Sequence, residues 1–297
     1  MANTKTIPRS YVDGFADSLE RLSAEMKRRL ADELAKVDYA MPVADVRETL
    51  IAIMRPYCYA SRATAAQVAA EFYDGIREFQ TGARMGAIGF DGYSDVAVER
   101  RVRSAVQPLA ESNDGSPEAV REVARALSEY VGYGIKAAAG GTVFGNGERD
   151  GRAVRFARIP RGTRSYPNGC PFCQMLASRG FKYRSELTAG KFDPDHYHDD
   201  CQCMVVPSWG EGSVEGYDRH DYVAGYQEWL DQDHSRHDER VAQTQRNRYD
   251  AWGRLKSGDG RRVDEKETLT DFDRARIRSK RTAAGNATKK RMGELGQ

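Results

Sequence analysis

Four of the five cysteines lie within one short stretch, and this clustering constrains the chain more than any other feature of its sequence. Cys170 and Cys173 form a C-x-x-C pair, a spacing that lets both sulfurs of a tight turn face one ion. Farther along, His198, Cys201 and Cys203 form an H-x-x-C-x-C run that supplies an imidazole and two more sulfurs. Zinc prefers thiolate and imidazole ligands in a tetrahedron, so we expect four of these five side chains to hold a structural Zn²⁺.

The spacing leaves the choice of the last ligand open and admits other chemistry. Cys201 and Cys203, two apart on an extended chain, project to the same side, and either one completes a set with Cys170, Cys173 and His198. A redox C-x-x-C pair and disulfides are the alternatives. A thioredoxin-like pair does not need the downstream run, and disulfides are disfavoured in the cytosol. A closed four-ligand site is structural, because a catalytic zinc keeps one position for water.

Acidic and histidine side chains crowd the approach to Cys201: Asp193, Asp195, His196, His198, Asp199 and Asp200. A zinc-stapled HNH-like nuclease places His and Asp near its metal in a comparable way, and it is the alternative function. Such a nuclease also needs a second, catalytic metal position, usually with an Asn and another His at set distances, and the sequence does not show that arrangement. We therefore expect no catalytic residues and no cofactor other than the structural zinc.

Residues 1–147 carry the apolar spacing of successive helices. Apolar residues recur every three or four positions from Val12 to Val37, which predicts one apolar stripe that packs against neighbouring helices, with a coiled coil as the alternative. A second helix is expected over Val43 to Met54, ending at Pro56 because proline cannot donate to the helical ladder. A third is expected over Thr64 to Phe79, followed by a Gly-rich break from Gly82 to Gly92.

Two more helices complete the predicted bundle. The fourth carries Val98, Val102, Val106 and Leu109 on one face. The fifth opens with Ser116 and Pro117, an N-cap followed by proline at the first helical position, and continues to Val131. Glycines at 132, 134, 140 and 141 are expected to weaken it, and the turn formers at 145–147 to end the region. Cys58 is alone in this half, and we expect it to be a buried apolar thiol.

The pattern changes near Gly145, where we place a domain boundary. Residues 148–215 are expected to form the Cys/His zinc module with short strands, the first over Arg152 to Pro160, where basic and apolar residues alternate as in a half-buried strand. Residues 216–256 are expected to be a C-terminal helical segment, mainly Asp221 to Arg254. The fold class is therefore α+β: a mainly helical region, a small zinc-stapled α/β module, a further helix and a basic tail at 257–297.

The net charge of +2, from 46 Lys and Arg against 44 Asp and Glu, conceals an acid-free basic stretch near the C-terminus. Such a block repels itself, so we expect it to be disordered. It is either a solvated tail without a partner or a non-specific contact for the phosphate backbone, since clustered cations release counterions on binding. The candidate DNA-binding residues are Arg274, Arg276, Arg278, Lys280, Arg281, Lys289, Lys290 and Arg291.

The sequence has no run of eighteen apolar residues, and its first residues lack the apolar core of a secretory signal. We therefore expect neither a membrane-spanning segment nor classical export, and the default compartment is the cytosol.

The cysteine-rich block resembles the corresponding part of the phage Mu F-like minor capsid, or head morphogenesis, proteins, in the form found in tailed phages and prophages of actinobacteria. In that family a C-x-x-C and a downstream H-x-x-C-x-C follow a long helical region. The commoner pattern has Pro-Asn where this chain has Asp199-Asp200, and all five candidate ligands remain in place. The matching residues are Arg158-Ile159-Pro160, Cys170-Pro171-Phe172-Cys173 through Gly180, and Tyr197-His198-Asp199-Asp200-Cys201-Gln202-Cys203 through Pro207.

The resemblance implies a structural role in a virion. Members of the family sit in few copies at the portal vertex inside the head and act in procapsid assembly or genome delivery, and some contact packaged DNA. For this chain it implies a non-enzymatic adaptor whose partners are the portal, capsid or scaffold proteins and, through the basic tail, packaged DNA. Its expected location is the phage head, after assembly in the host cytoplasm, with no membrane partner.

Overall fold

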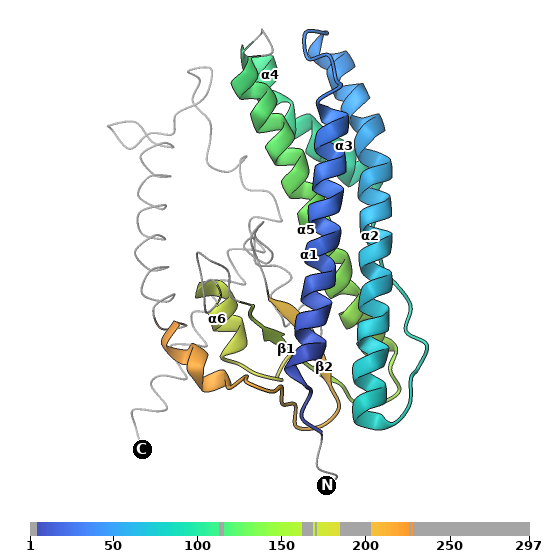
Figure 1. Ribbon diagram of the computed structural model, residues 1–297, viewed down its shortest axis with the longest axis vertical. Helices are drawn as coiled ribbons and strands as arrows, with labels where there is room; N and C mark the ends of the chain where they lie inside the picture. The colour runs from blue at the N-terminus through green and yellow to red at the C-terminus, as the bar shows by residue number, and fades with distance from the viewer. Residues whose placement is uncertain are drawn as a thin grey trace, which may run out of the picture. The chain divides into compact units, whose positions relative to one another are not determined.

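The computed structural model describes residues 5–112, 116–161, 169, 171–184, 203–225 and 227. All of them belong to the first of two compact units, Met1–Leu230. The part of the chain described is mainly helical with one two-stranded sheet, which confirms the α+β prediction (Figure 1). In chain order its elements are α1 (Arg9–Leu34), α2 (Val43–Thr81), α3 (Asp95–Ala105), α4 (Gln107–Ser112), α5 (Pro117–Arg149), β1 (Arg155–Ile159), α6 (Pro171–Ala177), β2 (Met204–Ser208) and the 3₁₀ helix η1 (Arg219–Tyr222).

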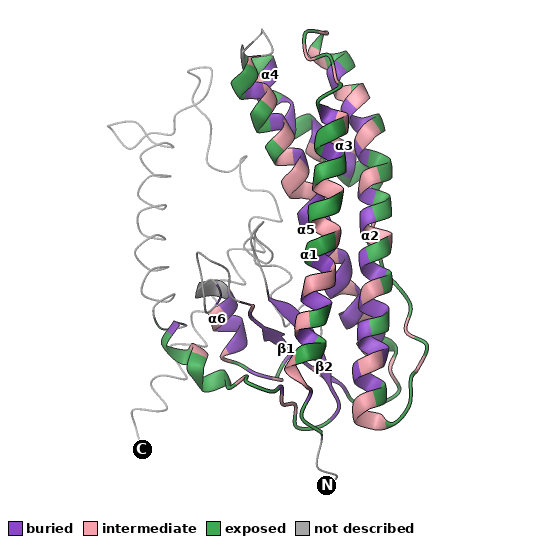
Figure 2. Ribbon diagram, in the orientation of Figure 1, coloured by how far each residue is buried: buried purple, intermediate pink, exposed green. Residues whose placement is uncertain are grey.

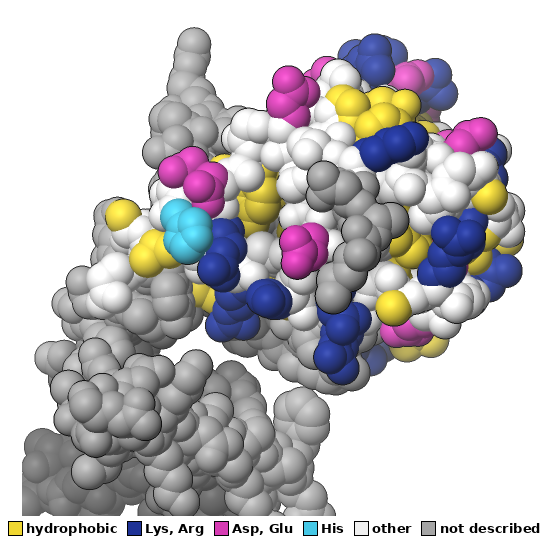
Figure 3. Space-filling view, turned by 90° about the horizontal axis from the view of Figure 1, so that it is seen from below, with side chains coloured by type: hydrophobic (Ala, Val, Ile, Leu, Met, Phe, Trp, Pro, Cys, Tyr) yellow, Lys and Arg dark blue, Asp and Glu magenta, His cyan; other side chains and the backbone are white. Residues whose placement is uncertain are grey.

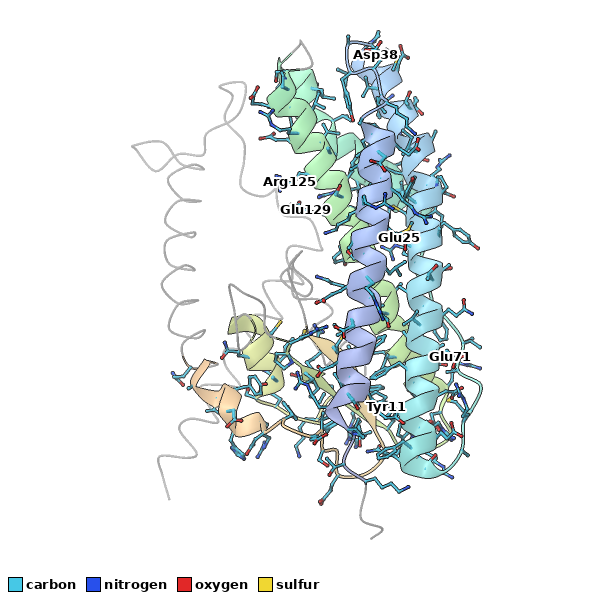
Figure 4. All side chains as sticks on the ribbon, in the orientation of Figure 1. Tyr11, Glu25, Asp38, Glu71, Arg125 and Glu129 are labelled. Carbon is cyan, nitrogen blue, oxygen red and sulfur yellow. The ribbon has the colours of Figure 1, made fainter. Side chains whose placement is uncertain are left out.

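The long helices α1, α2 and α5 lie side by side and bury a shared apolar core (Figure 1). The apolar stripe predicted for the first helix is confirmed, since Val12, Phe15 and Leu19 are buried on one face of α1. Phe15 stacks on Phe72 of α2 with ring centroids 4.1 Å apart. The side chains labelled in Figure 4, among them Glu25, Glu71 and Glu129, extend from the outer faces of these three helices, and Asp38 lies in the turn between α1 and α2.

Helix α2 is continuous where the sequence predicted two helices, so the expected end at Pro56 is wrong. Proline removes the hydrogen bond that its N–H would donate to the carbonyl of residue 52. Both Ala52 and Pro56 are exposed, so water can satisfy that carbonyl. Met54 and Cys58 on the opposite face are buried in the core, and this packing keeps the helix continuous across the proline.

Helix α5 also runs farther than predicted, through every glycine expected to weaken or end it. Tertiary contacts explain why glycine is present in this helix. Several of these glycines lie where another segment approaches so closely that a side chain would not fit. A Cβ at Gly145 would come within 2.9 Å of the Phe90 ring, and one at Gly147 would clash with Phe156 of β1. The cap at the other end is as predicted: the Ser116 hydroxyl accepts from the Ala119 N–H at 3.3 Å.

The predicted Gly-rich break connects α2 to α3 as an extended segment, which we call the strap (residues 83–94). Helix α2 ends at Gly82 with φ 81°, a left-handed conformation that glycine adopts without strain. The buried carboxylate of Asp74 accepts from the backbone N–H groups of Met85, Gly86 and Ala87. Farther along, the Asn146 side chain both donates to and accepts from the backbone of Ile88. Side chains of α2 and α5 thus fix the strap to the bundle.

Strands β1 and β2 pair antiparallel, from Arg155 opposite Ser208 to Ile159 opposite Met204. The prediction of a half-buried strand is wrong in its burial: Phe156, Ala157, Arg158 and Ile159 are all buried, as is all of β2 (Figure 2). The sheet is covered on both faces because α5 and α6 pack against it, so alternating residues do not alternate between core and solvent. Apolar residues of β1 and β2 belong to the same core as the bundle.

A buried ion pair joins the bundle to the sheet. Arg77 of α2 donates from Nε and Nη2 to the two carboxylate oxygens of Asp150, just after α5, at 2.8 and 3.3 Å. The same carboxylate accepts from Tyr73 Oη at 3.2 Å and from Trp209 Nε1, just after β2, at 3.0 Å. One side chain therefore contacts the C-terminal part of the long helix α2 and the end of β2 from its position at the end of α5.

Within the described ranges, no helix combines the length and the apolar character needed to cross a bilayer. The C-terminal helix predicted from Asp221 to Arg254 falls outside the described residues, apart from 221–225 and 227, and so does the whole tail at 257–297.

We expect Asp150→Asn to lower the free energy of unfolding by about 3 kcal/mol, because it leaves the buried Arg77 cation without its counter-charge. Denaturant unfolding followed by circular dichroism measures this. Glu25→Gln removes an exposed pair with Arg29 on α1 and should change the value by less than about 0.5 kcal/mol. A loss at Asp150 no larger than that of this control would contradict the role given to the ion pair.

The same variant should change the acid sensitivity of the fold. Burial alone raises the pKa of Asp150, but hydrogen bonds from Arg77 and the Arg152 N–H, with the Arg77 charge, outweigh it, so the pKa lies below its ordinary value of 3.8. A lowered folded-state pKa stabilises the fold fully above about pH 4 and loses that contribution as the pH falls through the folded value. The stability difference between wild type and Asp150→Asn should therefore shrink on acidification below that pH.

Cys58 should be inert to alkylation in the folded protein. It is 2% exposed, and burial raises the pKa of its thiol to about 11 against an opposing effect of the nearby Arg62. Because the thiolate is the reactive form, iodoacetamide at about pH 8 should leave Cys58 unmodified, and denaturant should make it reactive. Peptide mass spectrometry of the two samples measures this, and equal labelling would show that the site opens readily.

Candidate metal centre

Cys203 directly precedes β2, and the sheet register fixes its position. Ile159 of β1 lies opposite Met204, so Cys203 comes just beyond the last paired residues. Its side chain is on the same face of the sheet as that of Val205, the residue opposite Arg158. Cys203 is only 5% exposed, so it is a buried residue and not a solvated residue of a turn.

Cys173 approaches Cys203 from α6. The end of this short helix is held by two tyrosines: Tyr183 Oη donates to the carbonyl of Leu176 at 2.8 Å, and Tyr217 Oη donates to that of Ala177. Burial raises the pKa of Tyr183 to about 12, so it remains a donor at neutral pH. The backbone of Tyr183 in turn bonds to that of Phe156, which attaches the chain after α6 to β1. Cys173 is 2% exposed and packs against Cys203.

Arg158 is the third member of the site. Its side chain is fully buried, and it donates to Cys203 Sγ from Nε at 3.1 Å and from Nη2 at 2.6 Å. The alternation of basic and apolar residues predicts Arg158 only as one basic residue of a half-buried strand and does not indicate this contact. The sole trace in the sequence is that Arg158 interrupts a run of apolar residues, which does not separate a buried arginine from an exposed one.

The bundle closes the remaining side of the site. Tyr133 of α5 is partly buried and packs against the two cysteines. Beside them is a small hollow whose lining includes Phe15 and Leu19 of α1, Lys136 of α5, and Cys203. The cysteines therefore lie in the seam between the sheet and the bundle.

The structure brings together two of the five predicted ligands, Cys173 and Cys203, one from each half of the motif. Cys170, His198 and Cys201 lie outside the described residues, as do the acidic and histidine residues at 193–200 and all eight candidate DNA-binding residues of the tail. Among the residues that are described, no three His, Cys, Asp or Glu side chains are grouped so that they could hold one metal ion. The zinc site stays a prediction, because three of its five candidate ligands lie outside the described residues.

The surface of the described residues mixes basic and acidic side chains, which does not favour a polyanionic partner. Figure 3 shows the lower end of the molecule, where basic and acidic side chains are interspersed with apolar ones. Many exposed arginines of the helices are paired with acids, for example Arg121 with Glu118 and Arg125 with Glu129. Interspersed charges of both signs produce only a weak long-range field.

Comparison with known proteins gives one match. The family model described as VG15 protein matches residues 6–229, which includes the bundle, the sheet and the whole cysteine motif. Neither the curated proteins nor the solved structures that were searched contain a match. The matched family is one of viral, phage-type gene products, so the chain is a phage protein. It belongs to the VG15 family.

Proposed function

We propose that the protein is a minor capsid or head morphogenesis protein of a tailed phage or prophage, acting as a structural adaptor at the portal inside the head. Its phage family membership is the observation that carries this proposal. The helical bundle supports it by offering long exposed helix faces for portal, capsid or scaffold proteins. The protein then acts by binding and not by catalysis, is present in the virion, and assembles in the host cytoplasm.

A structural Zn²⁺ completes the proposal, and the described residues fit such an ion. Cys173 and Cys203 are buried side by side, and both are thiols in the structure, with no disulfide between them. Soft sulfur ligands that meet in a dry site suit zinc. Cys170, His198 and Cys201 are the other candidates. When bound, the ion would cross-link the chain after β1 to the chain before β2, in a segment too short to build a core of its own.

Zinc content and incorporation into heads test this proposal together. In purified phage that encode the chain, mass spectrometry should find the protein in gradient-purified heads. The double variant Cys170→Ser with Cys173→Ser should lose bound zinc, keep the helical circular dichroism of the bundle and be absent from heads. Cys58→Ala, which changes a buried cysteine remote from the motif to another small apolar residue, should behave as wild type in all three measurements. Normal infectious heads from the double variant would refute the adaptor role of the module.

Plasmid DNA with Mg²⁺ or Mn²⁺ separates the adaptor from the nuclease alternative. An adaptor binds or ignores the DNA, whereas a metal-dependent nuclease of the HNH type cuts it. We expect the plasmid to remain intact after incubation with the zinc-loaded protein. Metal-dependent cleavage would refute the adaptor function and favour the nuclease.

We also propose that the basic tail holds packaged DNA without sequence preference. Changing Arg274, Arg276, Arg278 and Arg281 to Gln should weaken DNA binding and lower the slope of log K against log salt by up to about 4, since each phosphate contact contributes about 0.9. The matched control changes four exposed arginines of the helices to Gln, Arg28, Arg103, Arg121 and Arg125. This control should retain the wild-type slope. Equal slopes for all three proteins would leave the tail as a solvated extension.

A further inference from the structure

The buried guanidinium of Arg158 is the most unusual feature of the site. Charged side chains are seldom fully buried unless a partner of opposite charge or a set of hydrogen bonds compensates them. Here two N–H groups of one guanidinium converge on a single sulfur, Cys203 Sγ. A neutral thiol is a weak acceptor, whereas a thiolate accepts strongly from a charged donor.

The sheet explains why these two side chains meet. Arg158 is opposite Val205 in the β1–β2 register, and Cys203 is two residues from Val205 on the same face. Such diagonal neighbours are within reach of a long side chain. Cys173 of α6 contacts Cys203 in the same buried cluster, so the guanidinium reaches a sulfur that already has a second cysteine beside it.

Charge balance gives Arg158 a role in a metal centre. Three cysteine thiolates carry three negative charges, and Zn²⁺ neutralises two of them. A site with three thiolates and one neutral histidine therefore has a net charge of −1. Burying that excess charge is costly unless a cation compensates it. The guanidinium is always protonated, carries one positive charge and has its donors in a rigid fork. One arginine can therefore compensate the charge of a Cys₃His site and also donate two hydrogen bonds to the sulfur of one ligand.

We propose that Arg158 is the positioning residue of the metal centre and that Cys203, and not Cys201, is the last thiolate ligand. Arg158 holds Cys203 in its metal-bound form beside Cys173 and compensates the excess negative charge. Outer-shell partners of this kind orient the ligand and tune metal affinity. The inference rests on the proposed zinc module and adds to it the choice of ligand and the residue that supports it.

Cobalt substitution in the full-length chain identifies the ligand. Co²⁺ in a tetrahedral thiolate site gives sulfur-to-cobalt charge-transfer absorption and strong visible bands, and Zn²⁺ should displace it. Cys203→Ser should lose part of the charge-transfer intensity and bind Co²⁺ more weakly. Cys201→Ser changes the same residue type two positions away, and it should retain the wild-type spectrum. The reverse result, or equal effects of the two variants, would overturn the choice of Cys203.

Chelator competition tests Arg158. Arg158→Gln should weaken zinc affinity by about 10- to 100-fold. Arg158→Lys, which restores the charge but not the fork, should recover part of the loss and shift the cobalt bands less. Arg155→Gln removes a partly exposed cation from the same strand without touching Cys203 and should bind zinc as wild type does. Unchanged affinity in Arg158→Gln, or no recovery in Arg158→Lys, would overturn the role of Arg158.

Two further results keep the inference distinct from the proposal beneath it. If the wild-type chain binds neither Co²⁺ nor Zn²⁺, or if intact-mass analysis finds a Cys173–Cys203 disulfide, the zinc module itself fails. If the wild-type chain binds zinc, and the Arg158 or Cys203 variants bind it as well as their control variants do, the zinc module stands and this inference fails. Should Arg158→Gln unfold by circular dichroism, the comparison of Arg158→Lys with Arg155→Gln decides the matter.

Discussion

The buried pair of Arg77 and Asp150 determines how the rest of the structure is assembled. A two-stranded sheet is too small to be stable alone, so β1 and β2 must pack against another element. Asp150 stands where α5 ends, accepts from α2 through Arg77 and from the end of β2 through Trp209, and so sets the position of the sheet against the bundle. With both faces of the sheet covered, Arg158 and Cys203 are excluded from water, and the chemistry of the cysteine cluster follows from that burial.

The features that the sequence predicts correctly depend on local chemistry. The apolar stripe of α1, the Ser116 cap of α5 and the Gly-rich break after α2 each reflect a few neighbouring residues. The failures at Pro56 and at the α5 glycines have the opposite origin. In both places the rule for an isolated helix is correct, but contacts from distant segments override it: the core packs across Pro56, and Phe90 and Phe156 occupy the space beside Gly145 and Gly147.

The candidate site divides in the same way. The spacing of the cysteines predicts the cluster, and the structure brings Cys173 of α6 and Cys203 before β2 into one buried cluster. Arg158 could not be found from its neighbours, since its burial depends on a strand that begins only at Met204. A motif defined by the spacing of candidate ligands thus does not reveal a side chain that contacts one of them from another strand, as Arg158 contacts Cys203.

The long connection between the two strands has a consequence for the order in which the protein folds. The helices of the bundle are neighbours along the chain, whereas β1 and β2 pair only after everything between Pro160 and Cys203 has been closed into a loop. Closing such a loop costs configurational entropy before any strand contact repays it, and distant contacts form slowly for that reason. We therefore expect the bundle to form first and to serve as the template for the sheet. A cross-link between Cys173 and the start of β2 would shorten the loop that remains to be closed.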